Sequence, residues 1–185
     1  MNYKQISNID QSISTSLEGL SDAINTIQFK DSVGFTIEKA DDLINFNELH
    51  HPGVYLIEVS NSDRVTDFNE WSENFLGKWH DEAYRKKFTP NSRKMRLKAH
   101  LESSNMDWIP LYLGKSRNIG KRVHQHIHLG LDKPTFALKL RARKNIQDLA
   151  FRLSCIKIDV KNYNVIMPLV ESQLRNRINP ILGRQ

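Results

Sequence analysis

The sequence has a single cysteine, Cys155, among its 185 residues. One thiol excludes internal disulfides and any zinc site built from several cysteines. The chain also lacks an apolar run long enough to cross a membrane, and its first ten residues do not show the basic-then-apolar pattern of a signal peptide. We therefore expect a cytoplasmic protein, whose 39% apolar and 26% charged residues are typical of a globular fold.

Acidic residues are scarce in the C-terminal part of the chain. Residues 1–63 hold three Lys or Arg against ten Asp or Glu, residues 64–114 hold nine against seven, and residues 115–185 hold fifteen against four. The net charge of +6 thus hides an acidic beginning and a strongly basic end. A basic region of this kind attracts a polyanion such as nucleic acid. The plainer alternative is a well-solvated basic surface.

An amphipathic helix is expected near the N-terminus. Its apolar residues recur at spacings of three and four, which marks one stripe of a helix: Ile6, Ile9, Ile13, Leu17, Leu20, Ile24 and Ile27. Such a helix either docks on the rest of the chain or pairs with a second chain to form a homodimer. Docking is favoured, because the pattern covers barely three heptads.

Three short runs predict strands. The first is Gly53–Val59 after His51-Pro52, the second is Trp108–Leu113, and the third is Phe151–Val160. The segment between the first two, about 60–107, is interpreted as a helical insertion with Trp71, Phe75, Trp79 and Tyr84. From Arg85 to Lys98 it holds seven basic residues and no acidic one. A basic stretch with aromatic residues suits nucleic-acid contacts, whereas an amphipathic helix with a buried aromatic face is the alternative.

Helices are expected after the second and third strands. Ser116 or Asn118 can cap a helix that runs to about Leu129. Residues 134–148 are predicted to be helical and basic. Pro168 suits the first turn of a last helix, which should end before Asn179-Pro180 because the residue before proline avoids helical angles.

Arg122 and His126 share one face of the helix after the second strand, since they are four residues apart. Ile119, Val123 and Ile127 form the neighbouring apolar stripe, so both polar side chains should point toward the sheet. A zinc site made by the alternating His124, His126 and His128 would need a strand instead. The capping residue and the apolar spacing favour the helix, on which three such rings do not converge.

Glu171 is one of only four acidic residues after position 114. In the first turn of a helix it could simply complement the helix dipole. A lone carboxylate within a basic region is also what a phosphate-processing site with one Mg²⁺ requires, because this ion takes oxygen ligands and bridges to phosphate.

These residues resemble the GIY-YIG nuclease family over about residues 50–182. The two signatures appear as Gly53-Val54-Tyr55 and Tyr112-Leu113-Gly114, with valine and leucine in place of isoleucine. Arg122 and His126 match the helical arginine and the histidine four residues after it. Glu171 matches the metal-binding glutamate and Asn179 the asparagine after the last helix. About 50 residues separate the two signatures, where compact members have a short hairpin.

The resemblance implies an α+β fold with a central three-stranded antiparallel sheet flanked by helices. The chain would then consist of a helical N-terminal extension, residues 1–49, and a GIY-YIG-like nuclease domain, residues 50–185, with the insertion at about 60–107. The implied activity is hydrolysis of phosphodiester bonds in DNA by an endonuclease with one Mg²⁺ or Mn²⁺ ion.

The resemblance also implies roles for the matched residues. Tyr55 would orient or deprotonate the attacking water, and because a free tyrosine ionises near about pH 10, it would need help. His126 would accept that proton, or Arg122 would favour the Tyr55 anion and clamp the charge on phosphorus. Tyr112 would hold the water or a phosphate oxygen, Glu171 would bind the metal, and Asn179 would support the site by hydrogen bonding.

Eight basic residues are predicted to bind nucleic acid: Lys115, Arg117, Lys121, Arg85, Lys86, Lys87, Arg93 and Lys94. Two other classes of protein compete with the nuclease. One is a non-catalytic nucleic-acid-binding module on the same fold, and the other is an interaction protein whose basic face meets an acidic partner. A purely binding domain has no need of a metal carboxylate amid positive charge, which favours the nuclease.

Overall fold

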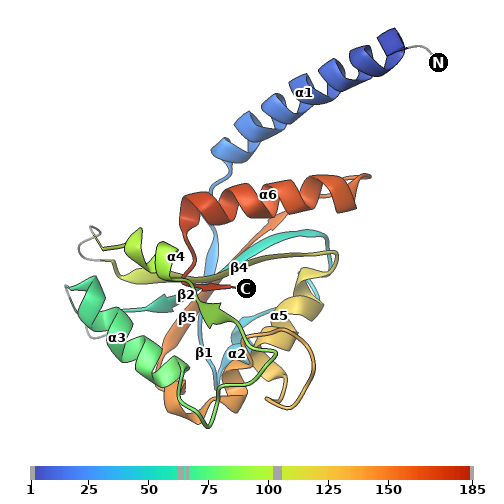
Figure 1. Cartoon of the computed structure of the whole chain (residues 1–185). Coiled ribbons are helices and arrows are strands. Elements are labelled where there is room, and N and C mark those ends of the chain that lie inside the picture. Colours follow the sequence, from blue (N-terminus) through green and yellow to red (C-terminus); the bar gives the residue numbers. More distant parts are fainter. Residues whose placement is uncertain (1–2, 62–64, 66, 102–105, 184–185) are drawn as a thin grey trace.

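The computed structural model describes residues 3–61, 65, 67–101 and 106–183. Its elements are α1 (Tyr3–Thr26), β1 (Ser32–Thr36), α2 (Ala40–Leu43), β2 (Gly53–Ser60), α3 (Phe68–Trp79), β3 (Asn91–Ser92), α4 (Lys94–Lys98), β4 (Trp108–Ser116), α5 (Ile119–His128), β5 (Ala150–Lys157), α6 (Tyr163–Ile178) and β6 (Leu182–Gly183), with two 3₁₀ turns, η1 (Leu140–Ala142) and η2 (Lys144–Ile146). The predicted α+β class is confirmed (Figure 1). No helix among these residues is apolar over a length that could cross a membrane.

Within the described residues the main sheet has four antiparallel strands in the order β1-β5-β2-β4. The three predicted strands are its members β2, β4 and β5. The fourth, β1, pairs with β5 at the edge, so the sheet is wider than the three strands expected. Only Phe35 of β1 is buried, which explains why its sequence carries a weak signal.

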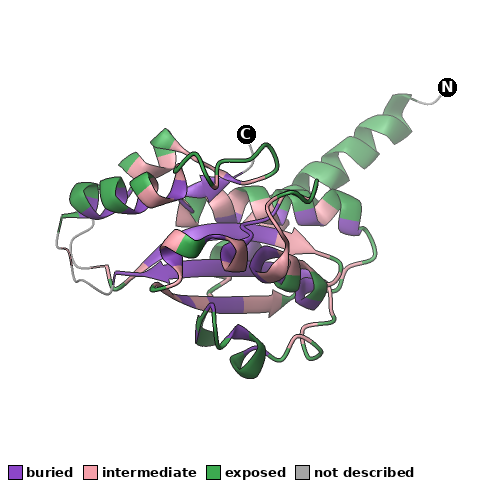
Figure 2. Cartoon of the chain, turned by 90° about the horizontal axis from the view of Figure 1, so that it is seen from below, coloured by how far each residue is buried: buried purple, intermediate pink, exposed green. Residues whose placement is uncertain are grey.

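Strand β2 is buried along its whole length because both faces of the sheet are covered (Figure 2). Tyr55, Ile57 and Val59 belong to the core that packs against α3 and α5. Val54 and Leu56 belong to the second core, which packs against α6 and the end of α1. Since alternate residues of a strand point to opposite faces, one apolar run serves two cores.

The predicted insertion is partly helical. Helix α3 buries Trp71, Phe75 and Trp79 in a row of stacked rings, with centroids 5.1 and 5.9 Å apart. These aromatic residues are therefore core residues, as the alternative interpretation had it. The basic stretch that follows is not one helix but a loop, the short strand β3 and helix α4. Residues 62–64, 66 and 102–105 of the insertion lie outside the described residues.

Two helix predictions are wrong. Residues 134–148 form a loop and the turns η1 and η2, because Lys139 adopts a left-handed conformation (φ 59°) that interrupts a helix. Helix α6 begins at Tyr163, so Pro168 lies inside it rather than in its first turn, and Glu171 lies near the middle. The predicted end before Asn179-Pro180 is confirmed, with Asn179 in the left-handed conformation (φ 54°).

The N-terminal helix docks only at its end. Ile24 is its single buried residue, and Gln173 and Arg177 of α6 bind the Ser21, Ile24 and Asn25 region through side-chain hydrogen bonds. Figure 1 shows the rest of α1 extending away from the sheet and its covering helices. The prediction that this helix docks on the domain is thus correct for the last turn or two and wrong for the remainder.

Candidate active site

Tyr55 and His126 meet in the core that covers one face of the sheet. The Tyr55 Oη and His126 Nε2 atoms are 2.8 Å apart, and both residues are almost fully buried. Tyr55 lies on β2, and His126 lies on α5, whose first turn is fixed by Asn118 accepting a hydrogen bond from the Lys121 N–H. The face of α5 that carries Val123 and Ile127 packs against the sheet and brings the histidine with it.

The hydrogen bonds of His126 define its tautomer. The backbone N–H of Leu138 donates to Nδ1 at 3.0 Å, so this nitrogen carries no hydrogen. Nε2 then carries the ring hydrogen and donates it to the Tyr55 oxygen. Burial, assisted by the positive charge of Arg122, lowers the pKa of His126 well below its usual value. The ring is therefore neutral, and this arrangement does not fit the role in which His126 accepts a proton from Tyr55.

Tyr112 completes an aromatic cluster with this pair. Its ring centroid lies 6.3 Å from that of Tyr55 and 4.7 Å from that of His126. Gly114 faces Tyr55 across the β2–β4 ladder, and a Cβ atom there would collide with the Tyr55 ring and hydroxyl. The glycine of the second signature is thus needed for Tyr55 to lie flat over β4.

Arg122 lies beside the cluster on α5. Its guanidinium donates to the side-chain oxygen of Gln125 at 2.9 Å and to the backbone carbonyl of Phe136. Burial and the neighbouring Tyr112 raise the pKa of Tyr55, while the charge of Arg122 and a hydrogen bond with it lower the pKa. The first two effects prevail, and the pKa of Tyr55 ends well above its usual value.

Glu171 lies on α6, which covers the face of the sheet opposite to that of the cluster. Its Oε1 atom accepts a hydrogen bond from Arg175 at 2.8 Å, and its Oε2 atom is 4.0 Å from the Lys115 ammonium. Its negative charge is close enough to contribute to the raised pKa of Tyr55 and of Tyr163. Tyr55, Tyr112, Arg122 and His126 are therefore brought together from β2, β4 and α5, whereas Glu171 contacts Arg175 and Lys115 and acts on Tyr55 through its charge.

The donor set at Glu171 fits one divalent ion held by a single carboxylate. The Oε2 atom makes no hydrogen bond within the described part of the chain, and Mg²⁺ commonly uses one or two carboxylates together with water and substrate phosphate. A group of three or more His, Cys, Asp or Glu side chains is not found among the described residues. Any ion here would depend on Glu171 and on oxygen atoms that the chain does not supply.

Asn179 is not brought to the cluster. It ends α6, its side-chain oxygen accepts a hydrogen bond from Arg96 at 3.4 Å, and its carbonyl accepts one from His100 at 2.7 Å. The residue therefore fixes the junction between α6 and α4. A direct supporting role for Asn179 beside Tyr55 is not seen.

The three-histidine alternative does not form. His124 and His128 stack at 4.1 Å on the outer side of α5 and pack against Phe46, and His128 pairs with Asp41 at 3.0 Å. His126 points the other way, into the sheet. The helix that the apolar spacing predicted separates the rings as expected.

The predicted nucleic-acid contacts fall into three groups. Lys115 and Arg117 lie against the Tyr163 ring, with the Lys115 ammonium 5.7 Å and the Arg117 guanidinium 4.3 Å from its centroid, and Lys121 lies on α5. Arg85, Lys86 and Lys87 line a separate cavity of about 550 Å³. Arg93 and Lys94 lie at the start of α4. All but Lys115 and Arg93 are exposed.

Three residues of this region carry no signal in the sequence. Arg175 holds Glu171, Leu138 fixes the tautomer of His126, and Arg143 is buried next to Leu138. Leu138 acts through its backbone, which any residue type would supply. Arg143 is one of many basic residues in its region, so only its burial distinguishes it. Comparison with protein-family models, curated proteins and solved structures finds no match to this chain.

Proposed function

We propose that this chain is a metal-dependent endonuclease of the GIY-YIG type, which hydrolyses phosphodiester bonds in DNA. The observation that supports this most is the convergence of Tyr55, Tyr112, Arg122 and His126 in one cluster, on which the charge of Glu171 acts. A domain that only binds DNA has no use for a tyrosine that is held by a neutral histidine and acted on by a carboxylate.

Tyr55 would position the reacting groups rather than act as a free base. Its oxygen already accepts a hydrogen bond from His126, so its own O–H remains to donate to a phosphate oxygen or to the attacking water. Because the pKa of Tyr55 is raised, the hydroxyl keeps its proton at neutral pH. His126 would hold this hydroxyl in place, and Tyr112 would lie against both rings and present a second hydroxyl.

Arg122 would stabilise the charge that develops on the phosphorus oxygens. Its planar fork matches two oxygens of a phosphate, and charge-assisted hydrogen bonds of this kind are about twice as strong as neutral ones. In the free chain this fork is bound to Gln125 and Phe136, neither of which is charged. A phosphate would therefore replace two neutral acceptors with charged ones, at little cost in lost interactions.

Glu171 would hold the divalent ion, Mg²⁺ or Mn²⁺, through the oxygen that faces Lys115. When bound, such an ion supplies Lewis-acid stabilisation of the leaving oxygen. Arg175 would fix the other carboxylate oxygen, and thereby the orientation of the side chain. Lys115, Arg117 and Lys121 would contact neighbouring phosphates around the cluster.

Cleavage of plasmid, single-stranded and branched DNA, with Mg²⁺ or Mn²⁺ and with EDTA, tests this function. We expect nicking or linearisation that EDTA abolishes. The variant Glu171→Gln should lose cleavage by at least 100-fold, as for removal of a group that stabilises transition-state charge, while still binding DNA. Full activity of this variant in Mg²⁺ would remove Glu171 from the site. The matched control Glu18→Gln, on the exposed face of α1, should cleave normally.

A non-catalytic nucleic-acid-binding module is the second candidate. Two observations favour it: Tyr55 and His126 are 1% and 0% exposed, and Glu171 already faces the cations Arg175 and Lys115. On this alternative the cluster is only a polar part of the core. Tight, salt-dependent DNA binding without any metal-dependent cleavage, on all three DNA forms, would support it over the nuclease.

A further inference from the structure

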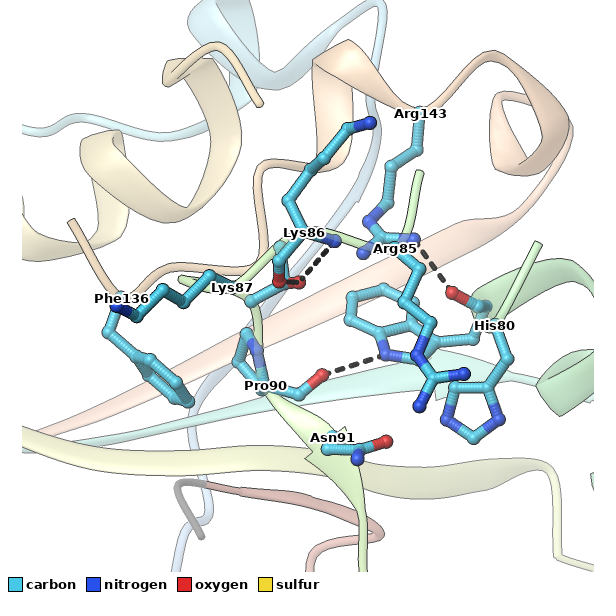
Figure 3. A pocket seen from close by; sticks show the side chains of 10 residues that line it. His80, Arg85, Lys86, Lys87, Pro90, Asn91, Phe136 and Arg143 are labelled. Carbon is cyan, nitrogen blue, oxygen red and sulfur yellow. Dashed lines mark hydrogen bonds between the residues drawn. The ribbon is translucent and has the colours of Figure 1, made fainter. Parts of the chain in front are cut away.

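A basic cavity lies next to the candidate active site and is not part of it. It is bounded by the end of α3, the loop after it and the segment 136–143, and has a volume of about 550 Å³. Figure 3 shows His80, Arg85 and Asn91 gathered at one end of this cavity and Phe136 at the other. Its lining carries four Lys or Arg side chains and no Asp or Glu.

Arg143 contributes a buried positive charge to the cavity. The residue is 1% exposed, and its guanidinium lies 3.7 Å from the centroid of the Trp79 ring. Three of its five N–H groups donate to the carbonyl oxygens of Leu138, Trp79 and Tyr84, at 3.2, 3.0 and 3.4 Å. Burial lowers the pKa of Arg143 to about 10, so it stays charged at neutral pH. None of the described carboxylates pairs with it.

His80 adds a buried nitrogen without a partner. Its Nε2 atom is inaccessible and makes no hydrogen bond to any described residue. Buried polar atoms nearly always have a partner, so this nitrogen indicates a missing one. Burial lowers the pKa of His80, a hydrogen bond with Asn91 opposes this, and the charges of Arg85 and Arg143 lower the pKa further. An anion in the cavity would reverse the effect of both charges and give Nε2 an acceptor.

The rim of the cavity supplies exposed cations. Arg85, Lys86 and Lys87 are exposed and follow one another along the loop. Lining made of one planar buried guanidinium, three exposed cations and an amide from Asn91 is suited to a phosphate group. A carboxylate ligand would leave several of these donors unused.

The backbones of two residues link this cavity to the candidate active site. Leu138 donates its N–H to His126 and accepts at its carbonyl from Arg143. Phe136 lines the cavity, and its carbonyl accepts from Arg122. We propose that the cavity binds a backbone phosphate of the DNA strand next to the phosphate that is cut. This assignment rests on the proposed nuclease function, which would use Arg122 for one phosphate and Arg143 for its neighbour.

The salt dependence of DNA binding in EDTA tests the assignment without cleavage. Lys86→Gln together with Lys87→Gln should lower the slope of log K against log salt by roughly 0.9, since the cavity holds one phosphate and each neutralised phosphate contributes about 0.9. The affinity advantage of the wild type over this double variant should then fall by about 3.5-fold between 50 and 200 mM salt. The matched control, Lys30→Gln with Lys39→Gln, removes the same charge from exposed positions far along the chain and should leave the slope unchanged.

Inorganic phosphate provides the second arm, read at the His80 ring by NMR. We expect phosphate to shift the His80 signals and to raise its pKa, and DNA to displace the phosphate. The proposal is overturned if the salt slope of the Lys86 and Lys87 variant equals that of the control. It is also overturned if DNA fails to displace inorganic phosphate, a result that would assign the cavity to a small phosphorylated ligand. Normal metal-dependent cleavage with an unchanged slope refutes only the cavity, whereas a changed slope without any cleavage refutes only the nuclease.

The exposed face of α1 carries an independent inference. Ile6, Ile9, Ile13 and Leu17 are between 44% and 59% exposed and lie in one stripe that ends at the docked Leu20 and Ile24. The apolar positions of the stripe repeat every eleven residues, as the pairs Ile6 and Leu17, Ile9 and Leu20, and Ile13 and Ile24 show. With this period a stripe runs nearly parallel to the axis of a straight helix. A second helix can therefore lie along its whole length.

Charge and symmetry identify the second helix as α1 of another copy. When two α1 helices are antiparallel and centred on Ile13, Ile9 faces Leu17, Ile6 faces Leu20, and Lys4 faces Asp22. The parallel arrangement would instead bring Lys4 to Lys4 and Asp22 to Asp22. The charged residues of α1 are Lys4, Asp10, Glu18 and Asp22, so the helix is acidic and unsuited to an anionic lipid surface.

The groove between α1 and α6 gives the partner helix a place to end. Leu17, Leu20, Ile24 and Leu169 line a cavity of about 330 Å³ there, and Leu169 is 40% exposed. In the antiparallel arrangement the first turns of the partner's α1 reach this groove. We infer that the chain forms an antiparallel homodimer through α1, which would bring two nuclease domains to one DNA duplex.

Sedimentation velocity of the full chain over a range of concentrations tests the dimer. We expect a dimer that becomes monomeric in Ile9→Glu with Ile13→Glu, and persists in Gln11→Glu with Thr15→Glu, which adds the same charge to the opposite face. Lys4→Glu and Asp22→Lys should each weaken the dimer, and the two together should restore it. A wild type that is monomeric throughout, a dimer indifferent to the stripe variants, or a charge swap that fails to compensate would each overturn the inference.

Discussion

Replacing His126 with glutamine separates two roles that this ring can have. The Leu138 N–H donates to Nδ1, and Nε2 donates to the Tyr55 oxygen. A glutamine side chain offers the same two groups, an oxygen that accepts and an N–H that donates. If His126 only holds the Tyr55 hydroxyl, His126→Gln keeps most of the cleavage rate. If His126 must take a proton from Tyr55, glutamine cannot replace it, because an amide is not basic in water.

The cost in stability is estimated from the two hydrogen bonds. In His126→Phe, a ring of similar size leaves the Leu138 N–H without a partner and removes the histidine partner of the Tyr55 hydroxyl. Each buried unsatisfied group costs ~1–3 kcal/mol, so this variant should lose roughly 2–6 kcal/mol of unfolding free energy. His126→Gln keeps both partners and should lose less, about 1–2 kcal/mol for imperfect packing.

The pH dependence of the unfolding free energy gives a second test of the buried, neutral His126 ring. Burial lowers the pKa of His126 in the folded chain, while the unfolded chain binds a proton at about pH 6.5. The unfolded state thus holds more protons below that pH, and acid favours it. The contribution of His126 to stability is complete above about pH 6.5 and falls by roughly 1.4 kcal/mol per pH unit below it, until the folded pKa is reached. Glutamine does not titrate, so the advantage of the wild type over His126→Gln should narrow on acidification.

Urea unfolding at pH 7, 6 and 5 and single-turnover cleavage at pH 7 measure both effects. A folded His126→Gln protein that binds DNA normally but does not cleave it would refute the donor role. A difference in unfolding free energy between wild type and His126→Gln that stays constant from pH 7 to pH 5 would refute the neutral, buried ring.

Arg122→Ala should slow single-turnover cleavage by 10²- to 10³-fold with a smaller change in DNA affinity, because a charge clamp acts mainly in the transition state. The exposed Lys30→Ala serves as its control, and an Arg122 variant only twofold slower than wild type would exclude the clamp. Gly114→Ala should cost ~1–3 kcal/mol and reduce cleavage by more than tenfold, since the new Cβ meets the Tyr55 ring. Gly77→Ala, in the open part of α3, should instead raise stability by about 0.5–1 kcal/mol. Equal thermal unfolding of these two glycine variants would contradict the close approach at Gly114.

Much of the fold could be predicted because its strongest signals are local. Strands β2, β4 and β5 are apolar runs bounded by turn residues, and helix α5 has a capping residue followed by an apolar stripe. The sequence signals fail where tertiary contacts determine the local conformation. The left-handed Lys139 interrupts what looks like a helix, and β1 owes its place to pairing with β5 rather than to its own residues.

The identities of the candidate-site residues were predicted more fully than the contacts that these residues make. Residue types and order suggested Tyr55, Tyr112, Arg122, His126 and Glu171. The β2–β4 register and the packing of α5 bring the first four together, whereas Glu171 contacts Arg175 and Lys115. What they do depends on contacts that no residue letter encodes. The role of His126 depends on a backbone N–H twelve residues away, and Asn179 has the expected identity but faces another helix.

The Leu138 peptide unit makes the candidate active site and the basic cavity dependent on each other. Its N–H holds His126, which holds Tyr55, and its carbonyl holds Arg143. Because both groups of one rigid, planar unit are in use, a shift that improves one hydrogen bond disturbs the other. A phosphate that draws Arg143 toward the cavity would therefore act on the orientation of the Tyr55 hydroxyl. Binding of one phosphate and alignment of the next would then be coupled through this peptide unit.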